Sequence, residues 1–268
     1  SATWQFFDQI GVKPVAATSR DIRAGDVVIY GGGGNLVPMY ADTRNAIETA
    51  AQLGVSAFVL LPHTVRGHES LLSVLDDRFT IFCRDHESFS HVSQSARGLR
   101  VGLAPDMALG LNVELLRQRV SKLSSGWKWR SLGVSRRRWR RYSRWLKATD
   151  SLQPDAAQRL EVMRSDVEAA RVPGAPERDL SDLYGSALSC RDECDVISER
   201  FLSVIDRAQT VFTDRLHVAI GAQLLGKPVM LLNNSYGKNH AVVGAFQSVA
   251  PLISLADADG RVVSHSGS

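Results

Sequence analysis

Cysteine is scarce and long apolar runs are absent in this chain of 268 residues. The three cysteines, Cys83, Cys190 and Cys194, are too few and too scattered for a disulfide framework. Cys190 and Cys194 have no second pair of ligand residues near them in the sequence, so two ordinary thiols are a better interpretation than half of a zinc site. No apolar run approaches the roughly 18 residues that a transmembrane helix needs, and no secretion signal is visible. These absences favour a protein of the reducing cytoplasm.

Acidic residues are missing from one long segment. Between Arg117 and Lys147 there are 12 lysines and arginines and no aspartate or glutamate, which leaves 20 basic against 28 acidic residues in the rest of the chain. This segment therefore supplies the excess of positive charge behind the net charge of +4. The overall composition, with 44% hydrophobic and 22% charged residues, is typical of a globular protein and excludes a disordered or collagen-like chain.

The basic segment also holds four of the five tryptophans, Trp127, Trp129, Trp139 and Trp145. Trp139, Tyr142 and Trp145 fall at helical spacing on one face, with arginines on the other faces. Three interpretations stay open. The segment is a helix between domains whose aromatic side chains pack on one of them, an amphipathic helix on an anionic membrane surface, or a nucleic-acid-binding element.

Predicted strands and helices alternate along most of the chain. Strands are predicted over 26–31, 56–62, 78–83 and 99–109, with helices over 40–53 and after Asp85 as a possible N-cap. The pattern lapses between 113 and 155, then resumes with strands at 159–170, 208–213 and 227–232 and helices at 191–206, 214–225 and 239–249. This alternation predicts an α/β fold with two Rossmann-like halves around a cleft. We expect the halves to be 1–112 and 156–268, joined by the basic segment 113–155.

The strongest local motif is the strand-to-helix junction TVFTDRLHVAIGAQLLGKPV at 210–229. The strand brings Thr213 and Asp214 to the cap position of a helix, with Arg215 and His217 in the first turn. Backbone N–H groups and the helix dipole already favour an anion there, and a guanidinium can bind a phosphate or a carboxylate through two hydrogen bonds. Because open α/β sheets place ligands at the carboxyl ends of strands, we interpret this junction as an anion site. The alternative is an arginine that pairs with a neighbouring acid and a histidine in a core hydrogen bond.

Two earlier strand ends present similar residues. His63 and Arg66 follow one predicted strand and Arg84 follows the next. The first strand ends in YGGGGN (30–35), which lacks the G-x-G-x-x-G spacing and so disfavours a nicotinamide cofactor, although glycines can let a backbone approach a ligand closely. Together these strand ends predict a pocket for a small, highly charged anion.

The same motifs carry a family resemblance. In this order, GDVVIYGGGGNL, LPHTVRG, CRDHESF, APDMAL, LEVMRSDVEA and TDRLHVAIGAQLLGKPVMLLNNSYGKN resemble the polysaccharide pyruvyl transferases over about residues 25–245, apart from the basic segment. The D-R-L-H helix start, L-G-K-P-V and the Y-G-K loop are the specific part. The resemblance implies a GT-B-like shape. It also implies transfer of the pyruvyl unit of phosphoenolpyruvate to two hydroxyls of a sugar, with a cyclic ketal and phosphate as products and no cofactor or metal.

The resemblance also implies roles for single residues. Phosphoenolpyruvate would be bound by Arg84, Arg215, Leu216, His217 and Lys238. The reaction needs an acid to protonate C3 of the donor and a base for the sugar hydroxyl; the candidates are His217 or His63 as the acid, because imidazole titrates near neutrality, and Asp106 or Asp214 as the base. Other residues expected in the cleft are Gly33, Gly34, Asn35, Arg164, Ser235 and Tyr236.

The implied acceptor is a sugar of a surface polysaccharide precursor on a lipid carrier. The basic segment 117–147 would then hold a cytoplasmic enzyme against the anionic inner face of the cell membrane. One alternative is a GT-B glycosyltransferase with a nucleotide-sugar donor. The acidic pair that would bind the ribose of this donor is Glu177 and Asp179. A second alternative, a nucleic-acid-binding protein, is disfavoured because the rest of the chain is acidic.

Overall fold

A computed structural model of the chain defines the fold. The structure describes residues 1–126, 136–165, 169, 179–180, 190–234, 237–257 and 261–262, with side chains left out for 124–126 and 136–142. The chain forms two compact units, each described here by itself. The amino-terminal unit comprises Phe6–Gly110 and Ala241–Phe246, and the carboxyl-terminal unit comprises Ser1–Gln5, Leu111–His240 and Gln247–Ser268.

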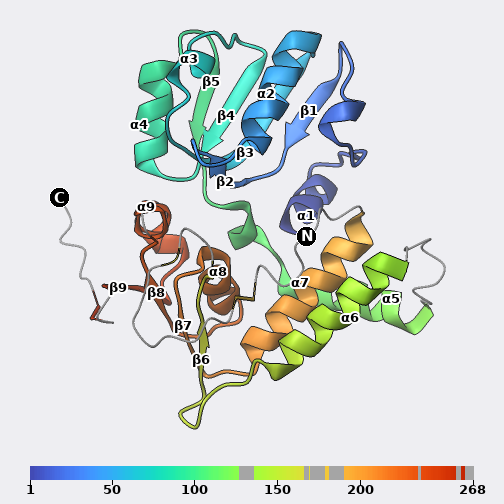
Figure 1. The fold of residues 1–268 in the computed structure, drawn as a ribbon, viewed down its shortest axis with the longest axis vertical. Helices are drawn as coiled ribbons and strands as arrows, with labels where there is room; N and C mark the ends of the chain where they lie inside the picture. Colours follow the sequence, from blue (N-terminus) through green and yellow to red (C-terminus); the bar gives the residue numbers. More distant parts are fainter. Residues whose placement is uncertain are drawn as a thin grey trace. The chain divides into compact units, whose positions relative to one another are not determined.

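The amino-terminal unit is built on a parallel five-stranded sheet (Figure 1). Its strands are β1 (Val27–Tyr30), β2 (Gly33–Leu36), β3 (Ala57–Val65), β4 (Phe79–Cys83) and β5 (Arg100–Leu103). The order is β1-β3-β4-β5, with β2 also pairing with β3, and every pair is parallel. The carboxyl ends of these strands therefore lie at one edge of the sheet, where the sequence places its histidine and arginine residues.

Helices α2 (Asp42–Leu53), α3 (Glu69–Leu72) and α4 (His86–Ser95) belong to the same unit, with 3₁₀ turns at Ser19–Asp21 and Met107–Gly110. Helix α4 packs against β3, β4 and β5, and α2 against β2. The predicted N-cap is confirmed: the Asp85 carboxylate accepts a hydrogen bond of 2.7 Å from the Ser88 backbone N–H. Gly54 ends α2 with φ of 68°, a backbone conformation that glycine adopts without a steric penalty.

The glycine run after β1 is not wholly the loop that the sequence suggests. Its last two glycines open β2, which pairs with the end of β3. A Cβ at Gly32 would lie 3.0 Å from the Pro62 carbonyl oxygen, and one at Gly33 would lie 3.1 Å from Cε1 of His63. A side chain at either position would force a neighbouring group to shift, because the backbone runs directly against the end of β3.

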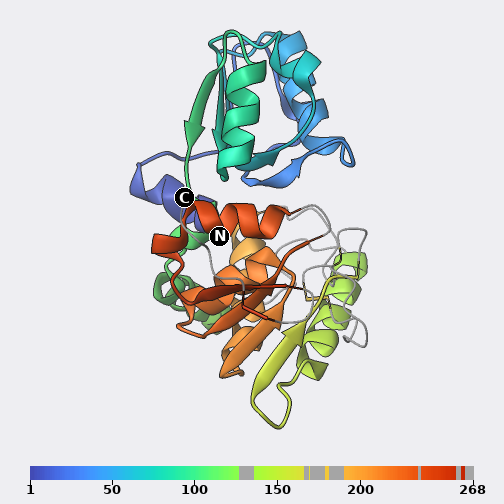
Figure 2. The ribbon, with the colours of Figure 1, turned by 90° about the vertical axis from the view of Figure 1, so that its left-hand side faces the viewer.

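The carboxyl-terminal unit contains a parallel four-stranded sheet in the order β6-β7-β8-β9 (Figure 2). The strands are β6 (Arg159–Val162), β7 (Thr210–Thr213), β8 (Val229–Leu232) and β9 (Ile253–Ala256). Helix α8 (Leu216–Leu224) packs on β7, β8 and α7 (Arg191–Asp206), and it is so deeply enclosed that Val218 through Ala222 are all buried. The 3₁₀ turn Gln247–Val249 also belongs to this unit, whereas helices α1 (Ala2–Gln9) and α9 (Lys238–Ala245) each have residues in both units.

The basic segment forms two helices of the carboxyl-terminal unit. Helices α5 (Val113–Gly126) and α6 (Arg136–Ser151) pack along α7, and the three lie side by side in Figure 1. Trp145 is only 2% exposed and packs with Leu146, Val196 and Ile197, so this aromatic residue is part of the core. Trp127 and Trp129, and the side chains of Trp139 and Tyr142, lie outside the described residues.

Basic residues of α5 are paired with acids of α7. Arg117 donates to Asp206 at 2.7 Å, and Arg119 donates to Asp195 at 2.6 Å and also to Asp192. Part of the charge that the sequence concentrates in this segment is therefore neutralised within the unit. Among the helices of the described residues, none has both the length and the apolar character needed to cross a bilayer.

Replacing Ile220 by Ala should destabilise the carboxyl-terminal unit by about 2–5 kcal/mol, because Ile220 is buried in α8 and its removal leaves a cavity. The matched control is Leu224→Ala on the same helix, where the side chain is only partly buried. Chemical denaturation followed by circular dichroism measures both. Equal losses for the two variants would contradict this account of the packing of α8.

Candidate functional site

The amino-terminal unit holds a buried polar cluster at the carboxyl edge of its sheet. Arg84, one residue beyond β4, donates from Nε to the Thr64 hydroxyl at 3.0 Å and from Nη1 to a carboxylate oxygen of Asp106. Asp106 lies beyond β5 and also accepts from the Ala108 backbone N–H at 2.9 Å. All three side chains are buried, so the charge of Arg84 is balanced by the carboxylate of Asp106.

His63 lies in the same cluster, inside β3. Its Nε2 is 2.7 Å from Oδ1 of Asn35, and that oxygen also accepts a hydrogen bond of 2.6 Å from the Thr43 hydroxyl. Burial, reinforced by the charge of Arg84, lowers the pKa of His63 to about 3. The imidazole is therefore neutral at physiological pH and serves as a hydrogen-bonding group rather than as a cation.

In the carboxyl-terminal unit, the turn between β7 and α8 differs in detail from the sequence expectation. Helix α8 begins at Leu216 with Arg215 as its N-cap residue, and Asp214 does not cap it. The Asp214 carboxylate instead accepts a hydrogen bond of 2.7 Å from the backbone N–H of Arg164, beyond β6. The Thr213 hydroxyl accepts from the Arg215 N–H at 2.9 Å and donates to the Val162 carbonyl at 2.6 Å. These bonds fix the turn against the end of β6.

Arg215 forms an ion pair with Asp179 in this unit, and both side chains are largely buried. Asp179 also accepts a hydrogen bond of 3.2 Å from the backbone N–H of Ser165. From the sequence, Asp179 is a candidate partner only for the ribose of a nucleotide sugar. The structure shows instead that it balances the charge of Arg215.

The start of α9 is tied to the same edge. Asn239 is fully buried and donates from Nδ2 to the carbonyl oxygens of Asp214, at 2.6 Å, and Leu232, at 3.0 Å. The Lys238 backbone N–H donates to Oδ1 of Asn234 at 2.7 Å, and the Lys238 side chain is buried. These bonds join the ends of β7 and β8 to α9. The role of Asn239 is not apparent from the sequence, in which its only indication is its position directly after the Y-G-K loop.

The structure thus places the predicted site residues in two groups. Gly33, Asn35, His63, Arg84 and Asp106 belong to the amino-terminal cluster, with Gly34 in β2. Arg164, Asp214, Arg215 and Lys238 lie at the carboxyl edge of the other sheet, with Leu216 buried and His217 exposed in the first turn of α8. Ser235 and Tyr236 lie outside the described residues.

Neither group resembles a metal site or a reactive thiol site. Within the described part of the chain, no cluster of three or more His, Cys, Asp or Glu side chains has the geometry to hold a metal ion. Burial raises the pKa of Cys83 to about 12, so this thiol is protonated at neutral pH and is a poor nucleophile. The chemistry at both edges is that of paired cations and hydrogen-bonding groups.

The described residues define an α/β protein with two parallel sheets and arginines at the carboxyl ends of strands in both units. A family model for polysaccharide pyruvyl transferase matches residues 2–236, and the chain therefore belongs to this family. Membership implies a transferase that transfers a pyruvyl group to a polysaccharide, and it disfavours the nucleotide-sugar alternative.

The fold is shared with a protein of known structure. The crystal structure of a functionally uncharacterised protein from Klebsiella pneumoniae subsp. pneumoniae NTUH-K2044 matches with a TM-score of 0.68 over 95% of this chain and 85% of that chain. At 23% sequence identity the likeness establishes the fold alone. No curated protein sequence matches this chain.

The buried His63 should make stability depend on pH. In the unfolded chain an imidazole has a pKa of about 6.5, whereas that of folded His63 is about 3. Between these values the unfolded state binds the extra proton, so the free energy of unfolding should fall by up to about 1.4 kcal/mol per pH unit as the pH decreases.

His63→Gln keeps a hydrogen-bonding group near the position of Nε2 and cannot titrate. Urea midpoints measured between pH 7.5 and 4.5 should therefore fall less steeply for this variant than for the wild type. His217→Gln is the control because His217 is exposed. Parallel curves for the wild type and His63→Gln would rule out the neutral buried imidazole.

Proposed function

We propose that this protein is a ketal-pyruvate transferase that uses phosphoenolpyruvate as donor and a saccharide of a surface polysaccharide precursor as acceptor. The observation that carries the proposal is the strand-to-helix turn at Arg215. There a guanidinium, the N-terminus of α8 and the nearby strand end at Arg164 meet at the carboxyl edge of one sheet. Family membership supplies the pyruvyl group and the saccharide, and the turn supports the identity of the donor.

Phosphoenolpyruvate carries a phosphate and a carboxylate on a three-carbon frame, so it needs several cationic or N–H donors close together. The α8 N-terminus offers backbone N–H groups with the positive end of the helix dipole. In our proposal an anionic group of the donor displaces the Asp179 carboxylate and pairs with Arg215. Lys238 at the start of α9 contributes a second cation to the same edge.

The chemistry consists of two additions at C2 of the donor. The first sugar hydroxyl adds to C2 while a proton is delivered to C3, which converts the methylene into a methyl group. The C2–O bond to phosphate then breaks, inorganic phosphate leaves with the bonding electrons, and the second hydroxyl closes the ketal with loss of its proton. Positive groups around the phosphate favour this departure, because charge accumulates on its oxygens.

We assign the acid to His217 rather than His63. His217 is exposed in the first turn of α8, whereas the low pKa of His63 leaves it without a proton to donate from an imidazolium at neutral pH. Asp106 is our choice for the base. Its carboxylate is paired with Arg84, and an anion that binds Arg84 would return basicity to it. Asp214, whose carboxylate accepts a hydrogen bond from the Arg164 backbone N–H, is the alternative base.

In this proposal the two units form a GT-B-like pair that brings both groups of residues to one substrate. The acceptor sugar sits on a lipid carrier at the cytoplasmic face of the membrane, and the basic segment 117–147 holds the enzyme there. Because Arg117 and Arg119 are paired with acids of α7, membrane binding would depend on the remaining basic residues of the segment.

Arg215→Ala should lower kcat/KM for phosphoenolpyruvate by about 10²–10³-fold, the loss typical of removing one charged contact to a transition state. The measurement is phosphate release together with a mass gain of pyruvate minus water on candidate glycosides. The control is Arg159→Ala, which removes an exposed arginine at the amino end of β6 in the same unit.

Removing Arg215 also leaves the buried Asp179 carboxylate without this ion pair. The double variant Arg215→Ala with Asp179→Asn therefore separates function from folding. It should recover stability, measured by thermal unfolding, and stay inactive. Wild-type activity in either Arg215 variant would contradict the donor site.

Membrane attachment is tested by sedimentation with vesicles that contain phosphatidylglycerol, at low and at 0.5 M salt. We expect the protein to sediment with these vesicles at low salt and to stay in solution at high salt, because screening weakens attraction between exposed charges. Vesicles of phosphatidylcholine alone are the control. Absence of sedimentation with the anionic vesicles at low salt would remove this part of the proposal.

A further inference from the structure

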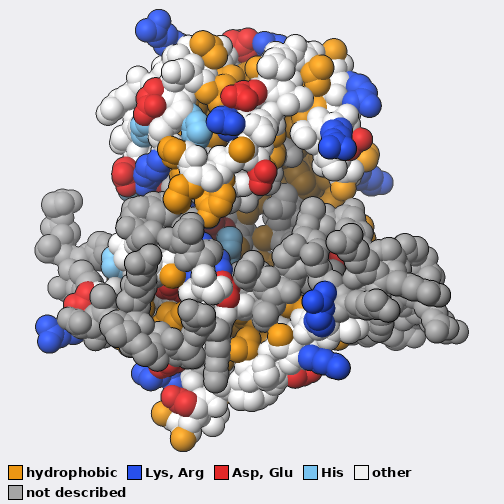
Figure 3. All heavy atoms as spheres, viewed as in Figure 1, with side chains coloured by type: hydrophobic (Ala, Val, Ile, Leu, Met, Phe, Trp, Pro, Cys, Tyr) orange, Lys and Arg blue, Asp and Glu red, His pale blue; other side chains and the backbone are white. Residues whose placement is uncertain are grey.

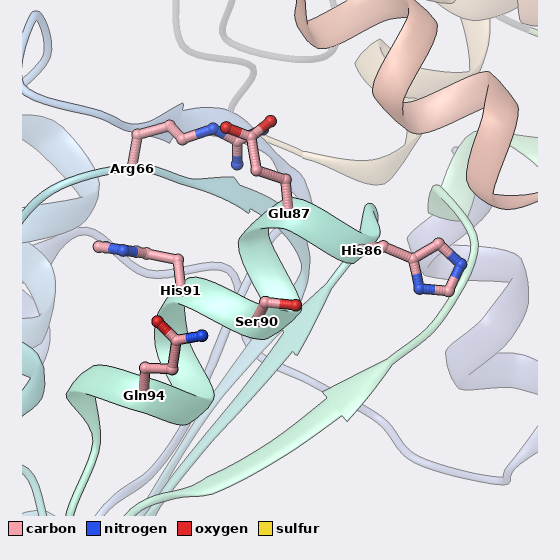
Figure 4. Close-up of a pocket in the computed structure, with 6 residues that line it drawn as sticks. All are labelled: Arg66, His86, Glu87, Ser90, His91 and Gln94. Atoms are coloured by element: carbon pink, nitrogen blue, oxygen red, sulfur yellow. The ribbon is translucent and has the colours of Figure 1, made fainter. Parts of the chain in front are cut away.

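A second polar site lies in the amino-terminal unit, on the outer face of α4. It is a shallow cavity of about 480 Å³, open to solvent along one side. Figure 4 shows Arg66 and Glu87 side by side, with Ser90, His91 and Gln94 on the following turns of α4. The lining residues are Arg66, His86, Glu87, Ser90, His91 and Gln94.

The cavity shares an edge of the sheet with the Arg84 cluster. Arg66 directly follows β3, which ends at Val65, and His86 begins α4 two residues after Arg84. Asp85 lies between the two groups of residues and is hydrogen-bonded to both the N–H and the hydroxyl of Ser88. The end of the cavity formed by Arg66, His86 and Glu87 is therefore close to the carboxyl ends of parallel strands, where open α/β sheets bind ligands, and the cavity extends from there along the outer face of α4.

The hydrogen bonds of Arg66 determine which ligand the cavity suits. Nη1 donates to the Val65 carbonyl and the Ser88 hydroxyl, and Nη2 donates to Asp85 at 3.2 Å and Glu87 at 2.6 Å. All four N–H groups on the two terminal nitrogens thus have acceptors in the protein, and two carboxylates neutralise the charge. A phosphate or carboxylate ligand would have to displace two carboxylates, those of Asp85 and Glu87, to pair with Arg66.

The other lining groups suit a neutral ligand with hydroxyls. Gln94 and Ser90 are exposed and each offers both a donor and an acceptor, and Glu87 offers acceptors. The His91 Nε2–H donates to the Gly67 carbonyl at 2.9 Å, which in the neutral ring makes Nδ1 an acceptor. The visible surface of this unit also intersperses acidic and basic side chains rather than collecting one sign (Figure 3).

We propose that this cavity binds a neutral sugar residue of the acceptor saccharide, through the side chains of Glu87, Ser90 and Gln94. The inference rests on the proposed function for its saccharide, and it adds a binding site for that saccharide outside the Arg84 and Arg215 groups. The residues named bind the acceptor and do not touch the reacting atoms.

The binding test uses ligand-observed NMR with methyl glycosides of glucose, galactose, mannose and N-acetylglucosamine, in the absence of phosphoenolpyruvate. At least one glycoside should bind the wild type, and Ser90→Ala with Gln94→Ala should weaken it about three- to tenfold for each lost hydrogen bond. Both positions are exposed, so the double variant should keep its fold. Asp77→Asn, an exposed carboxylate of the same unit outside the cavity, is the control and should bind like the wild type.

Inorganic phosphate at equal concentration should leave glycoside binding unchanged. Displacement of the glycoside by phosphate, equal affinity of the double variant and the wild type, or absence of binding by every glycoside would overturn the proposal. Glu87→Gln checks whether the Glu87 carboxylate takes part in glycoside binding, because this variant removes a carboxylate from the cavity while the Arg66–Asp85 pair is retained.

Turnover separates this proposal from the proposed function. If pyruvyl transfer occurs, the cavity variants should raise KM for the acceptor and leave both kcat and KM for phosphoenolpyruvate near wild-type values. An unchanged KM for the acceptor would contradict the proposed sugar site and would leave the proposed transferase activity unaffected. If the variants weaken glycoside binding but no pyruvyl group is transferred from phosphoenolpyruvate, the result would support the sugar site and contradict phosphoenolpyruvate as the donor.

Discussion

The positive charge of a guanidinium that is removed from water must be balanced by a negative charge. This constraint shapes the polar clusters at the carboxyl edges of both sheets. Arg84 is paired with Asp106 in one unit and Arg215 with Asp179 in the other. An unpaired buried charge costs several kcal/mol, so the carboxylates let these cations persist without a ligand. In the proposed reaction an anionic substrate would replace one of these carboxylates rather than fill an uncompensated positive pocket. Its affinity would then be the difference between the free energies of two ion pairs.

The positions of these arginines could be predicted from the sequence, but their partners could not. Apolar runs ending at Cys83 and Thr213 identify strands, and a parallel sheet then puts the following residues at one edge. Asp179 is 36 residues from Arg215 and follows a segment with no periodic pattern. No local rule pairs them, because the contact depends on how distant segments pack. The role of Asn239 could not be predicted for the same reason, since its side chain donates to the carbonyl oxygens of Asp214, one residue beyond β7, and Leu232, at the end of β8.

The errors in the secondary structure also have physical causes. Strand β2 is glycine-rich, and β-propensity disfavours glycine, yet Gly33 lies so close to His63 that a larger residue there would force a neighbouring group to shift. The alternation of predicted strands and helices lapses over 113–155, where the structure has helix α5. Its arginines form ion pairs with acidic residues of α7, so part of the positive charge of this segment is neutralised in the folded protein. Trp145 shows the same effect for hydrophobicity, since an aromatic residue among arginines is buried between helices.

Arg66 and Arg84 illustrate how neighbouring strand ends can acquire different roles. Arg84 is balanced by one carboxylate, so an incoming anion has a single competitor. Arg66 has two carboxylates, a hydroxyl and a carbonyl around its terminal nitrogens, so it is held as a structural link between β3 and α4. Arg66 also lines the cavity on α4, where we propose a neutral ligand. The number of acceptors around each guanidinium, rather than its place at a strand end, is the basis on which we assign the charged donor and the hydroxyl-rich acceptor to different sites.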